Sequence, residues 1–221
     1  HYNDSALVDF IGGMTIKFEH GQGNWVPAPP ELNTLKFNAE KFKDKRVIFL
    51  VRDPRDVLVS SWYHLKYREN IYLEGLEQFI YESLTGIDKV IAFFNMWYEN
   101  KAQLQECLLL SYEDLHQNTL KNFNQIIEFT KVHYDGDIAK ESVEYSSFSN
   151  MKKMETSGNL KEPWMKPGAK GQKNSMKIRK GKVGSFREEL DAAHIQYLNN
   201  RIKERLNPDL IEFLNLDLSN E

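Results

Sequence analysis

Cysteine is almost absent from this 221-residue chain, and so are long apolar runs. The single cysteine, Cys107, cannot form an internal disulfide and lies in the apolar run 107–110, so we expect a reduced core residue in a cytoplasmic protein. No run approaches the roughly 20 apolar residues that a membrane-spanning helix needs. No charged n-region followed by an apolar h-region opens the chain. We therefore expect neither a membrane span nor export.

Two kinds of binding motif are also missing. No pair of histidines has the spacing of metal ligands, so we expect no metal cofactor. No Gly-x-x-x-x-Gly-Lys-Ser/Thr loop is present, and no carboxylate is well placed for magnesium, which argues against a P-loop kinase. With 41% hydrophobic and 28% charged residues, the composition is ordinary for one globular domain.

The net charge of −3 conceals an uneven distribution. Residues 152–187 carry eleven basic and two acidic residues, a local charge of +9, which leaves −12 on the remainder. A basic segment on an acidic body concentrates a positive field and favours a polyanionic ligand. Nucleic acid would satisfy the same field, so charge alone does not choose the ligand.

The apolar run 47–51 predicts the strand around which the chain is organised. Such a run, rich in Val and Ile, is typical of a central, parallel strand buried on both faces. Asp53 and Pro54 then fit the N-cap and first position of a helix, and Asp56 sits where a capping-box acid reaches back. Arg52 should therefore lie at the carboxyl edge of the sheet, where open α/β folds bind ligands.

An arginine at that edge is suited to an anion. Its planar guanidinium can hold a phosphate with two hydrogen bonds, and Ser60 can add a hydroxyl. The alternative is that an Arg52–Asp56 or Arg55–Asp53 ion pair merely fixes the turn.

Hydrophobic periodicity predicts the remaining elements. A second strand is expected at 108–111 and a short buried element at 6–11. Residues 14–34 and 146–186 are expected to be irregular, since they are rich in proline or glycine or lack a period. Helices are expected at 37–42, 54–65, 75–84, 87–105, 118–130 and 187–206. Strands alternating with helices indicate an α/β fold with a parallel sheet.

Three further segments carry side chains suited to a nucleotide. They are Tyr112-Glu-Asp-Leu, Ser146-Ser-Phe-Ser-Asn-Met and Arg179-Lys-Gly-Lys-Val-Gly-Ser-Phe. In the last, glycine lets backbone N–H groups approach phosphate oxygens, and the adjacent cations supply charge. Each segment has a plain alternative, in which the aromatic side chains pack in the core and the basic run is a solvated surface.

Together with the Arg52 stretch, these segments resemble the sulfotransferases that use 3′-phosphoadenosine 5′-phosphosulfate (PAPS). The resemblance covers residues 47–186. It implies a parallel sheet flanked by helices in a P-loop-hydrolase-like architecture, with PAPS as co-substrate and no metal. The nucleotide-binding residues that it implies are Arg52 and Ser60 at the 3′-phosphate, Tyr112, Ser146 and Phe148 around the nucleotide, and Arg179, Lys180 and Gly181 in the basic motif.

The resemblance fails at the amino end. The family's Lys-Ser/Arg-Gly-Thr-Thr/Ser-Trp loop, which cradles the 5′-phosphosulfate, has no counterpart here. We therefore expect a single sulfotransferase-like domain over 1–221 that is incomplete at its amino end. The alternatives are that the missing part is supplied from elsewhere, or that the protein binds only the 3′-phosphoadenosine end. The family's general base precedes the Arg-bearing strand, which nominates His1, with His20 and Glu19 as alternatives. The histidines at 64, 116, 133 and 194 are expected at the surface or at helix boundaries.

The sequence thus predicts transfer of a sulfuryl group from PAPS to an acceptor hydroxyl or amine. The acceptor is expected to be a small molecule, lipid or carbohydrate, and nucleic acid is not expected. The alternative is a non-catalytic sulfotransferase-like protein that holds 3′-phosphoadenosine nucleotides or polyanions through residues 152–187.

Overall fold

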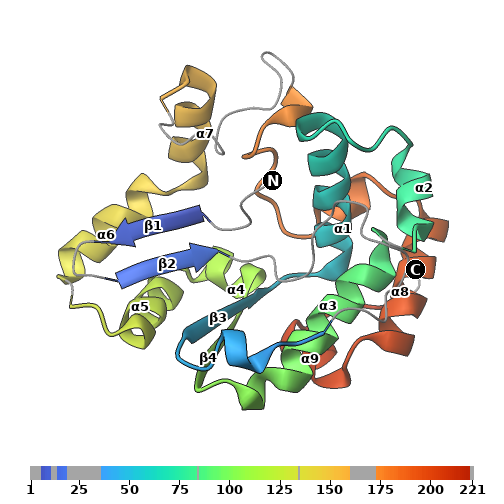
Figure 1. Cartoon of the computed structure of the whole chain (residues 1–221). Coiled ribbons are helices and arrows are strands. Elements are labelled where there is room, and N and C mark those ends of the chain that lie inside the picture. The colour runs from blue at the N-terminus through green and yellow to red at the C-terminus, as the bar shows by residue number, and fades with distance from the viewer. Residues whose placement is uncertain are drawn as a thin grey trace.

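The computed structural model describes residues 6–10, 14–18, 36–83, 85–133, 135–159 and 173–219, and only the backbone of the first two segments. The described strands are β1 (Ala6–Phe10), β2 (Met14–Phe18), β3 (Arg46–Val51) and β4 (Glu106–Ser111) (Figure 1). The described α-helices are α1 (Pro54–Tyr63), α2 (Leu76–Tyr81), α3 (Ile87–Asn100), α4 (Tyr112–Gln117), α5 (Thr119–Thr130), α6 (Gly136–Tyr145), α7 (Phe148–Ser157), α8 (Ala192–Arg205) and α9 (Pro208–Phe213). A π-helical turn, η3 (His64–Arg68), continues α1, and 3-10 turns lie at 39–41, 101–103, 173–175 and 185–188.

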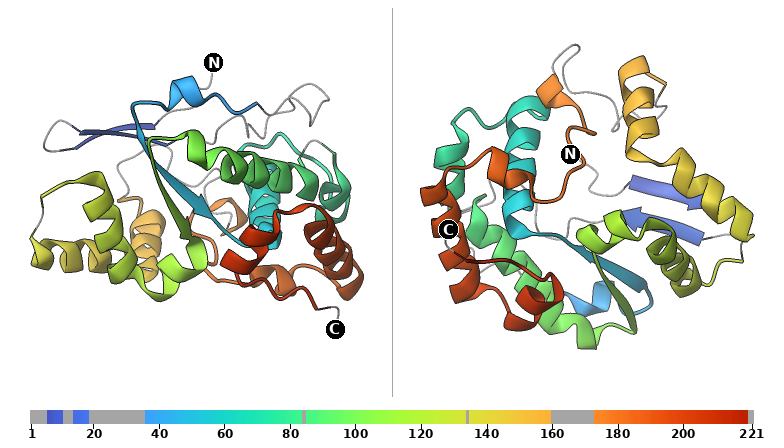
Figure 2. Two further views of the ribbon diagram at one scale, coloured as in Figure 1. Left: turned by 90° about the horizontal axis from the view of Figure 1, so that it is seen from below. Right: turned by 180° about the vertical axis from the view of Figure 1, so that it is seen from behind.

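The two central strands are parallel, as expected. β3 pairs with β4 in a register that runs from Arg46 opposite Glu106 to Val51 opposite Ser111. Because the two strands end in register, Arg52 and Tyr112 leave the sheet at the same edge. β1 and β2 form a separate antiparallel hairpin, which lies at the end of the molecule that carries α5 and α6 (Figure 2).

The prediction that β3 is buried on both faces was wrong. Phe49 and Val51 are buried, and Phe49 packs against Trp97 of α3 at 5.9 Å between ring centroids. On the other face, Ile48 and Leu50 are 39% and 47% exposed. In the described part of the chain, β3 has one strand neighbour, and aromatic side chains of α3 pack on the face that carries Phe49, whereas the face that carries Ile48 and Leu50 stays partly exposed.

The core lies between α1, α3, α8 and α9 (Figure 1). Its most deeply buried apolar side chains come from helices far apart in the sequence, among them Leu58, Phe79, Leu198, Ile202 and Leu210. Asp88 of α3 and Arg201 of α8 add a two-bonded ion pair, at 3.1 and 2.5 Å. No helix among the described residues is long and apolar enough to cross a membrane.

Several expected boundaries differ from those observed. Met14–Phe18 is a strand and Phe148–Ser157 is a helix, although both fall in tracts expected to be irregular. The expected helix at 37–42 is only the 3-10 turn 39–41, and the last predicted helix begins at Ala192. Signals for α7 were present, since Phe148, Met151 and Met154 recur at three residues and Gly158 ends the helix with φ +73°. The surrounding lysines obscured them.

Candidate functional site

The turn between β3 and α1 is stabilised mainly by residues of the turn itself, and one of its hydrogen bonds comes from a distant residue, Glu113. The Asp53 side chain caps the helix by accepting the Arg55 N–H at 2.9 Å, and Pro54 occupies the first turn, as predicted. The capping-box role expected for Asp56 falls instead to Glu113, whose Oε1 accepts the Asp53 N–H at 2.9 Å. Burial raises the pKa of Glu113, although the Asp53 N–H opposes the rise. Asp56 is thereby released to point elsewhere.

Arg55 is a structural residue. It is 2% exposed and donates to both carboxylate oxygens of Asp53. It also donates to Asn199 Oδ1 at 2.6 Å and to the Asp217 carbonyl at 2.8 Å, and its guanidinium lies 4.3 Å above the Phe186 ring. Both ion pairs of the alternative interpretation are present, Arg55–Asp53 at 2.7 Å and Arg52–Asp56 at 3.0 Å.

Arg52 differs from Arg55 in keeping donor capacity. Its Nη2 donates to Asp56 Oδ2 at 3.0 Å and to the Lys182 carbonyl at 3.1 Å, and its guanidinium lies 4.3 Å from the centre of the Tyr112 ring. Its Nε is buried and has no hydrogen-bond partner within the described residues. A buried donor without an acceptor costs about 1–3 kcal/mol, so this edge of the guanidinium is suited to receive a ligand oxygen.

The basic carboxyl-terminal motif lies against this turn. Asp56 is 1% exposed, and its carboxylate accepts the N–H of Gly184 at 2.8 Å and of Phe186 at 3.0 Å. The Ser185 hydroxyl donates to the same carboxylate at 3.1 Å. The structure thus brings residues 182–186 beside Arg52, across some 130 positions of sequence. The N–H groups of Gly184 and Phe186 are therefore used by Asp56 in this structure.

Phe148 and Gly181 form the neighbouring wall. A Cβ on Gly181 would lie 2.2 Å from the Phe148 ring, and Gly181 has φ +57°, so only glycine fits here without strain. Lys152 lies 5.3 Å from the centre of this ring and donates to the Arg179 carbonyl at 3.2 Å. His116 Nε2 lies 2.9 Å from the Gly181 carbonyl oxygen. Since Phe148 remains 38% exposed, it offers a face on which a base could stack.

Arg179 and Lys180 are held by acidic partners in this structure. Arg179 stacks 3.7 Å from the centre of the Tyr63 ring and pairs with Glu189 at 2.9 Å. Lys180 pairs with Glu188 at 2.9 Å and with Glu189 at 2.6 Å. Hydrogen bonds from Lys182 and Lys180 lower the pKa of Glu188 to about 2. Burial opposes ionisation of Glu189, but hydrogen bonds from Lys180, Arg179 and Tyr63 lower its pKa. A phosphate would have to compete with both carboxylates.

The other predicted residues are less informative. Ser60 and Ser146 are exposed, and neither hydroxyl makes a hydrogen bond within the part of the chain that the structure describes. The nominated bases His1, His20 and Glu19 lie outside the described residues. No group of three His, Cys, Asp or Glu among the described residues is arranged to hold a metal ion.

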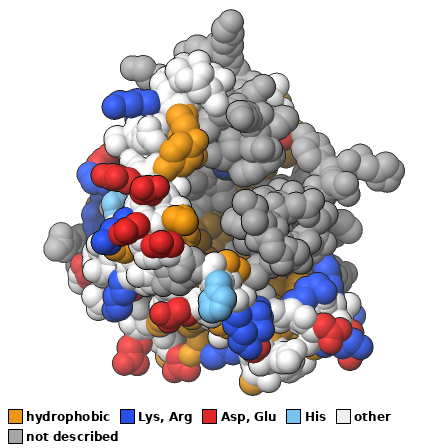
Figure 3. All heavy atoms as spheres, turned by 90° about the vertical axis from the view of Figure 1, so that its left-hand side faces the viewer, with side chains coloured by type: hydrophobic (Ala, Val, Ile, Leu, Met, Phe, Trp, Pro, Cys, Tyr) orange, Lys and Arg blue, Asp and Glu red, His pale blue; other side chains and the backbone are white. Residues whose placement is uncertain are grey.

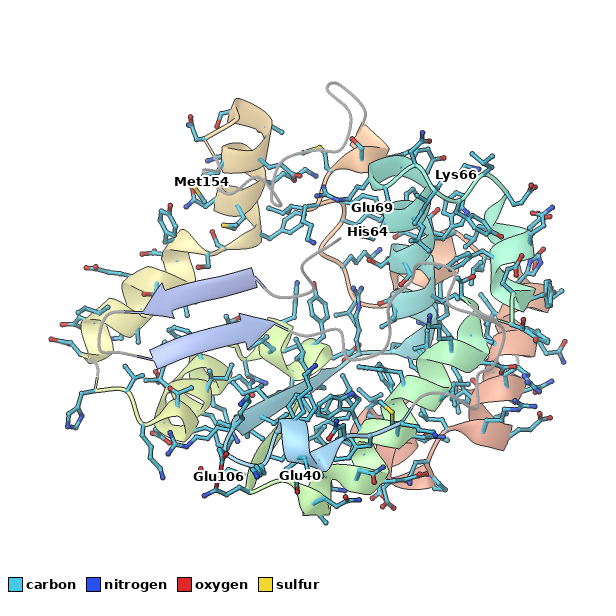
Figure 4. All side chains as sticks on the ribbon, in the orientation of Figure 1. Glu40, His64, Lys66, Glu69, Glu106 and Met154 are labelled. Carbon is cyan, nitrogen blue, oxygen red and sulfur yellow. The ribbon has the colours of Figure 1, made fainter. Side chains whose placement is uncertain are left out.

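Histidine 64 lies in a more structured setting than the sequence indicated. It caps α1 and begins the π-helical turn η3, and its Nε2 is 3.5 Å from Glu69 Oε1. Figure 4 shows His64 and Glu69 together at the end of α1, on the side that faces α7. Where the described side chains of the side that carries α5 and α6 are visible, acidic and basic groups are interspersed (Figure 3).

Sequence reasoning missed the roles of three residues that shape this site. Asp56 was expected to serve its own turn but holds the basic motif, and His116 contacts the Gly181 carbonyl. Glu155, which is 2% exposed on α7, accepts the N–H groups of Lys177 at 2.6 Å and Ile178 at 2.9 Å. A signal for Glu155 was available, because it is one of only two acids in the basic segment 152–187.

Comparisons with known proteins agree on one family. A family model described as the sulfotransferase domain matches residues 27–208. The chain is similar to a 3-alpha-hydroxysteroid sulfotransferase of Cavia porcellus, with 27% identity over 93% of this chain and 71% of that protein. It is also similar to cytosolic sulfotransferase 12 of Arabidopsis thaliana, with 21% identity over 96% of this chain and 67% of that protein.

Solved structures share the fold. A retinol dehydratase in complex with androsterone and the inactive cofactor PAP aligns with a TM-score of 0.58 and 23% identity, over 81% of this chain and 50% of that one. A mouse sulfotransferase in complex with PAP aligns with a TM-score of 0.61 and 19% identity, over 77% of this chain and 61% of that one. The chain thus spans about half to three fifths of these two solved chains, and the expected α/β fold is confirmed.

Proposed function

Because this chain belongs to the sulfotransferase domain family, we propose that it transfers a sulfuryl group from PAPS to an acceptor hydroxyl or amine. The observation that carries the proposal is the meeting of two cationic segments, the β3–α1 turn with Arg52 and the motif at 179–186. The Arg52 Nε has no hydrogen-bond partner among the described residues, and the partly exposed Phe148 ring lies beside Gly181. Such a set of groups suits a phosphorylated adenosine.

In this proposal, different residues of the site bind different parts of the nucleotide. Arg52, aided by Ser60, binds the 3′-phosphate, because its Nε is a buried donor that has no acceptor within the described residues. Tyr112 borders the adenine and Phe148 stacks on it, with Ser146 at the same wall. Arg179 and Lys180 exchange part of their pairing with Glu188 and Glu189 for the phosphate. Gly181 leaves room for the Phe148 ring.

The transfer itself needs few protein groups. The acceptor oxygen attacks the sulfur of PAPS in line, and the bond from sulfur to the 5′-phosphate oxygen breaks, which releases 3′-phosphoadenosine 5′-phosphate (PAP). A base removes the acceptor proton, and cations spread the charge that develops on the leaving phosphate. We assign the base to His1, with His20 and Glu19 as alternatives.

The acceptor is proposed to be a hydroxyl of a small molecule. The name of the Cavia porcellus relative, a hydroxysteroid sulfotransferase, supports this class, and lipid and carbohydrate hydroxyls belong to the same chemistry. No metal is assigned to the reaction, and nucleic acid is not expected as a partner. A cytoplasmic location is supported by the name of the Arabidopsis thaliana relative, a cytosolic sulfotransferase.

Calorimetry with PAP and with adenosine 5′-phosphate tests the proposal. We expect PAP to bind at least about tenfold more tightly, because only PAP carries the phosphate that Arg52 meets, and a charge-assisted hydrogen bond is worth about 1.5–3 kcal/mol. Equal affinities would contradict the proposed site. Transfer from labelled PAPS to a panel of phenols, sterols and sugars tests the reaction. Tight PAP binding with no transfer to any acceptor would instead favour the binding-only alternative.

Replacement of Lys180 by alanine is expected to reduce this preference. The lysine contributes a charge-assisted contact to the 3′-phosphate, so PAP should lose about 1.5–3 kcal/mol of binding free energy and adenosine 5′-phosphate much less. Lys182→Ala is the matched control, because Lys182 also pairs with Glu188 but its side chain is 62% exposed. Equal losses for both nucleotides in Lys180→Ala would argue that Lys180 does not contact the phosphate.

Replacement of Gly181 by alanine is expected to displace Phe148. The new Cβ would overlap the ring, so adenosine nucleotides should lose about 1–3 kcal/mol of stacking free energy. Gly158→Ala is the control, because Gly158 has a similar φ of +73° but no atom within 4 Å of the added Cβ. In both variants the left-handed backbone costs about 1–2 kcal/mol of strain. The difference between their nucleotide affinities, measured by calorimetry, therefore reports on the contact with the Phe148 ring. Similar affinities in the two variants would count against the stacking role of Phe148.

A further inference from the structure

Asp56 lies at the junction of the two cationic segments. Each of its carboxylate oxygens receives two donors. Oδ2 accepts from Arg52 Nη2 and the Gly184 N–H, at 3.0 and 2.8 Å. Oδ1 accepts from the Ser185 hydroxyl and the Phe186 N–H, at 3.1 and 3.0 Å. The carboxylate thus uses its full capacity of four hydrogen bonds while its side chain is 0% exposed.

These contacts hold Arg52 and residues 184–186 together, which is not a function of a helix cap. The N–H that a capping-box acid would accept is already taken by Glu113, so Asp56 does not serve the turn in which it lies. Three of its four donors come from positions 184–186, and the fourth is the guanidinium of Arg52. Arg52 in turn donates to the carbonyl of Lys182. Asp56, Arg52 and the loop therefore form a closed ring of contacts.

We propose that Asp56 is a positioning residue for the nucleotide: it holds Arg52 and the loop 182–186 at the separation that a 3′-phosphate requires. This inference rests on the proposed function. By occupying Nη2 of Arg52, the carboxylate turns the remaining N–H groups of the guanidinium toward the ligand. By drawing in the N–H groups of Gly184 and Phe186, it also fixes the path of the chain just after Gly181.

Asp56→Asn is the direct test, because it keeps the shape but replaces one acceptor oxygen by an NH₂ group that faces donors. We expect the Kd for PAP to rise about tenfold to a hundredfold, as for partners that orient a contacting group. The Kd for adenosine 5′-phosphate should change by less than about threefold, because that nucleotide lacks the phosphate that Arg52 meets. In an Arg52→Ala background, the further loss of PAP affinity caused by Asp56→Asn should be much smaller than in the native protein.

Two further variants separate positioning from folding. Asp88→Asn weakens the ion pair with Arg201 between α3 and α8, and we expect it to lower the melting temperature without changing the ratio of the two nucleotide affinities. Ser185→Ala removes one of the four donors, and it serves if Asp56→Asn does not fold. We expect Ser185→Ala to raise the Kd for PAP about two- to tenfold and to leave the Kd for adenosine 5′-phosphate almost unchanged.

The outcomes distinguish the inference from the function on which it rests. If Asp56→Asn and Ser185→Ala both leave the ratio of the affinities for PAP and adenosine 5′-phosphate unchanged, the positioning role is overturned. Native protein that does not prefer PAP, or Arg52→Ala that binds PAP normally, would instead remove the nucleotide site itself. The proposal is supported if the Asp56 and Ser185 variants lose affinity for PAP but not for adenosine 5′-phosphate, while Asp88→Asn keeps the native ratio of the two affinities.

Discussion

Arg52→Ala is expected to weaken PAP binding by about 2–5 kcal/mol, which is roughly 30-fold or more in Kd. The native guanidinium is held by Asp56, the Lys182 carbonyl and the Tyr112 ring, so it pays little to become ordered when a ligand binds. Truncation removes the buried Nε donor and also leaves the Asp56 carboxylate without its cation. Calorimetric titration with PAP measures the loss.

Arg46→Ala is the matched control for Arg52. Arg46 begins the strand that Arg52 follows, but its side chain is 36% exposed and pairs with Glu106 at 3.1 Å, at the opposite end of β3. Its loss should leave PAP affinity unchanged, because long-range attraction between exposed charges is screened by salt. Comparable losses in the two variants would mean that only the general positive field matters, and unchanged affinity in Arg52→Ala would refute its assignment.

Arg55→Ala is expected to lower the free energy of unfolding by about 3–5 kcal/mol. Arg55 lies only three positions after Arg52, yet its guanidinium is buried against the Phe186 ring. Its loss leaves the Asp53 carboxylate without a cation and removes the donors to Asn199 and the Asp217 carbonyl. The large effect comes mainly from the Asp53 carboxylate and the Asn199 amide, which are 7% and 1% exposed and would lose their donor. Urea denaturation followed by circular dichroism measures it.

Arg187→Ala provides the comparison for Arg55. Arg187 approaches the same Phe186 ring at 4.6 Å and lies 3.9 Å from the Asp217 carboxylate, but its side chain is 53% exposed. We expect a loss of about 0–1 kcal/mol, since water replaces the contacts of an exposed arginine. The two arginines differ mainly in burial, so similar losses would show that burial of Arg55 is not the source of its effect.

The parts that the sequence predicts well are those with short-range causes. The strand at 46–51, the N-cap at Asp53 and the helix after Pro54 all follow from neighbouring residues, and each was confirmed. The edge position of Arg52 follows as well, since a strand that ends beside a parallel neighbour must deliver its next residue to that edge.

The parts that the sequence does not predict depend on distant partners. The capping box assigned to Asp56 was wrong because Glu113, which is 60 positions from Asp53, accepts the Asp53 N–H. The exposed Ile48 and Leu50 could not be anticipated, because an apolar run does not say whether both faces of its strand are covered. Similarly, no residue next to Arg179 in the sequence indicates its ion pair with Glu189, which forms because the 3-10 turn at 185–188 lies between them.

The bonds from Asp56 to Gly184 and Phe186 tie together positions 128 and 130 residues apart. Closing this junction carries the entropy cost of a long loop, which includes β4 and α3. A proteolytic fragment that keeps Arg52 but ends before Gly184 lacks three of the four donors to Asp56. We expect such a fragment to lose its affinity for the nucleotide, because the two segments that would bind it come from distant parts of the chain.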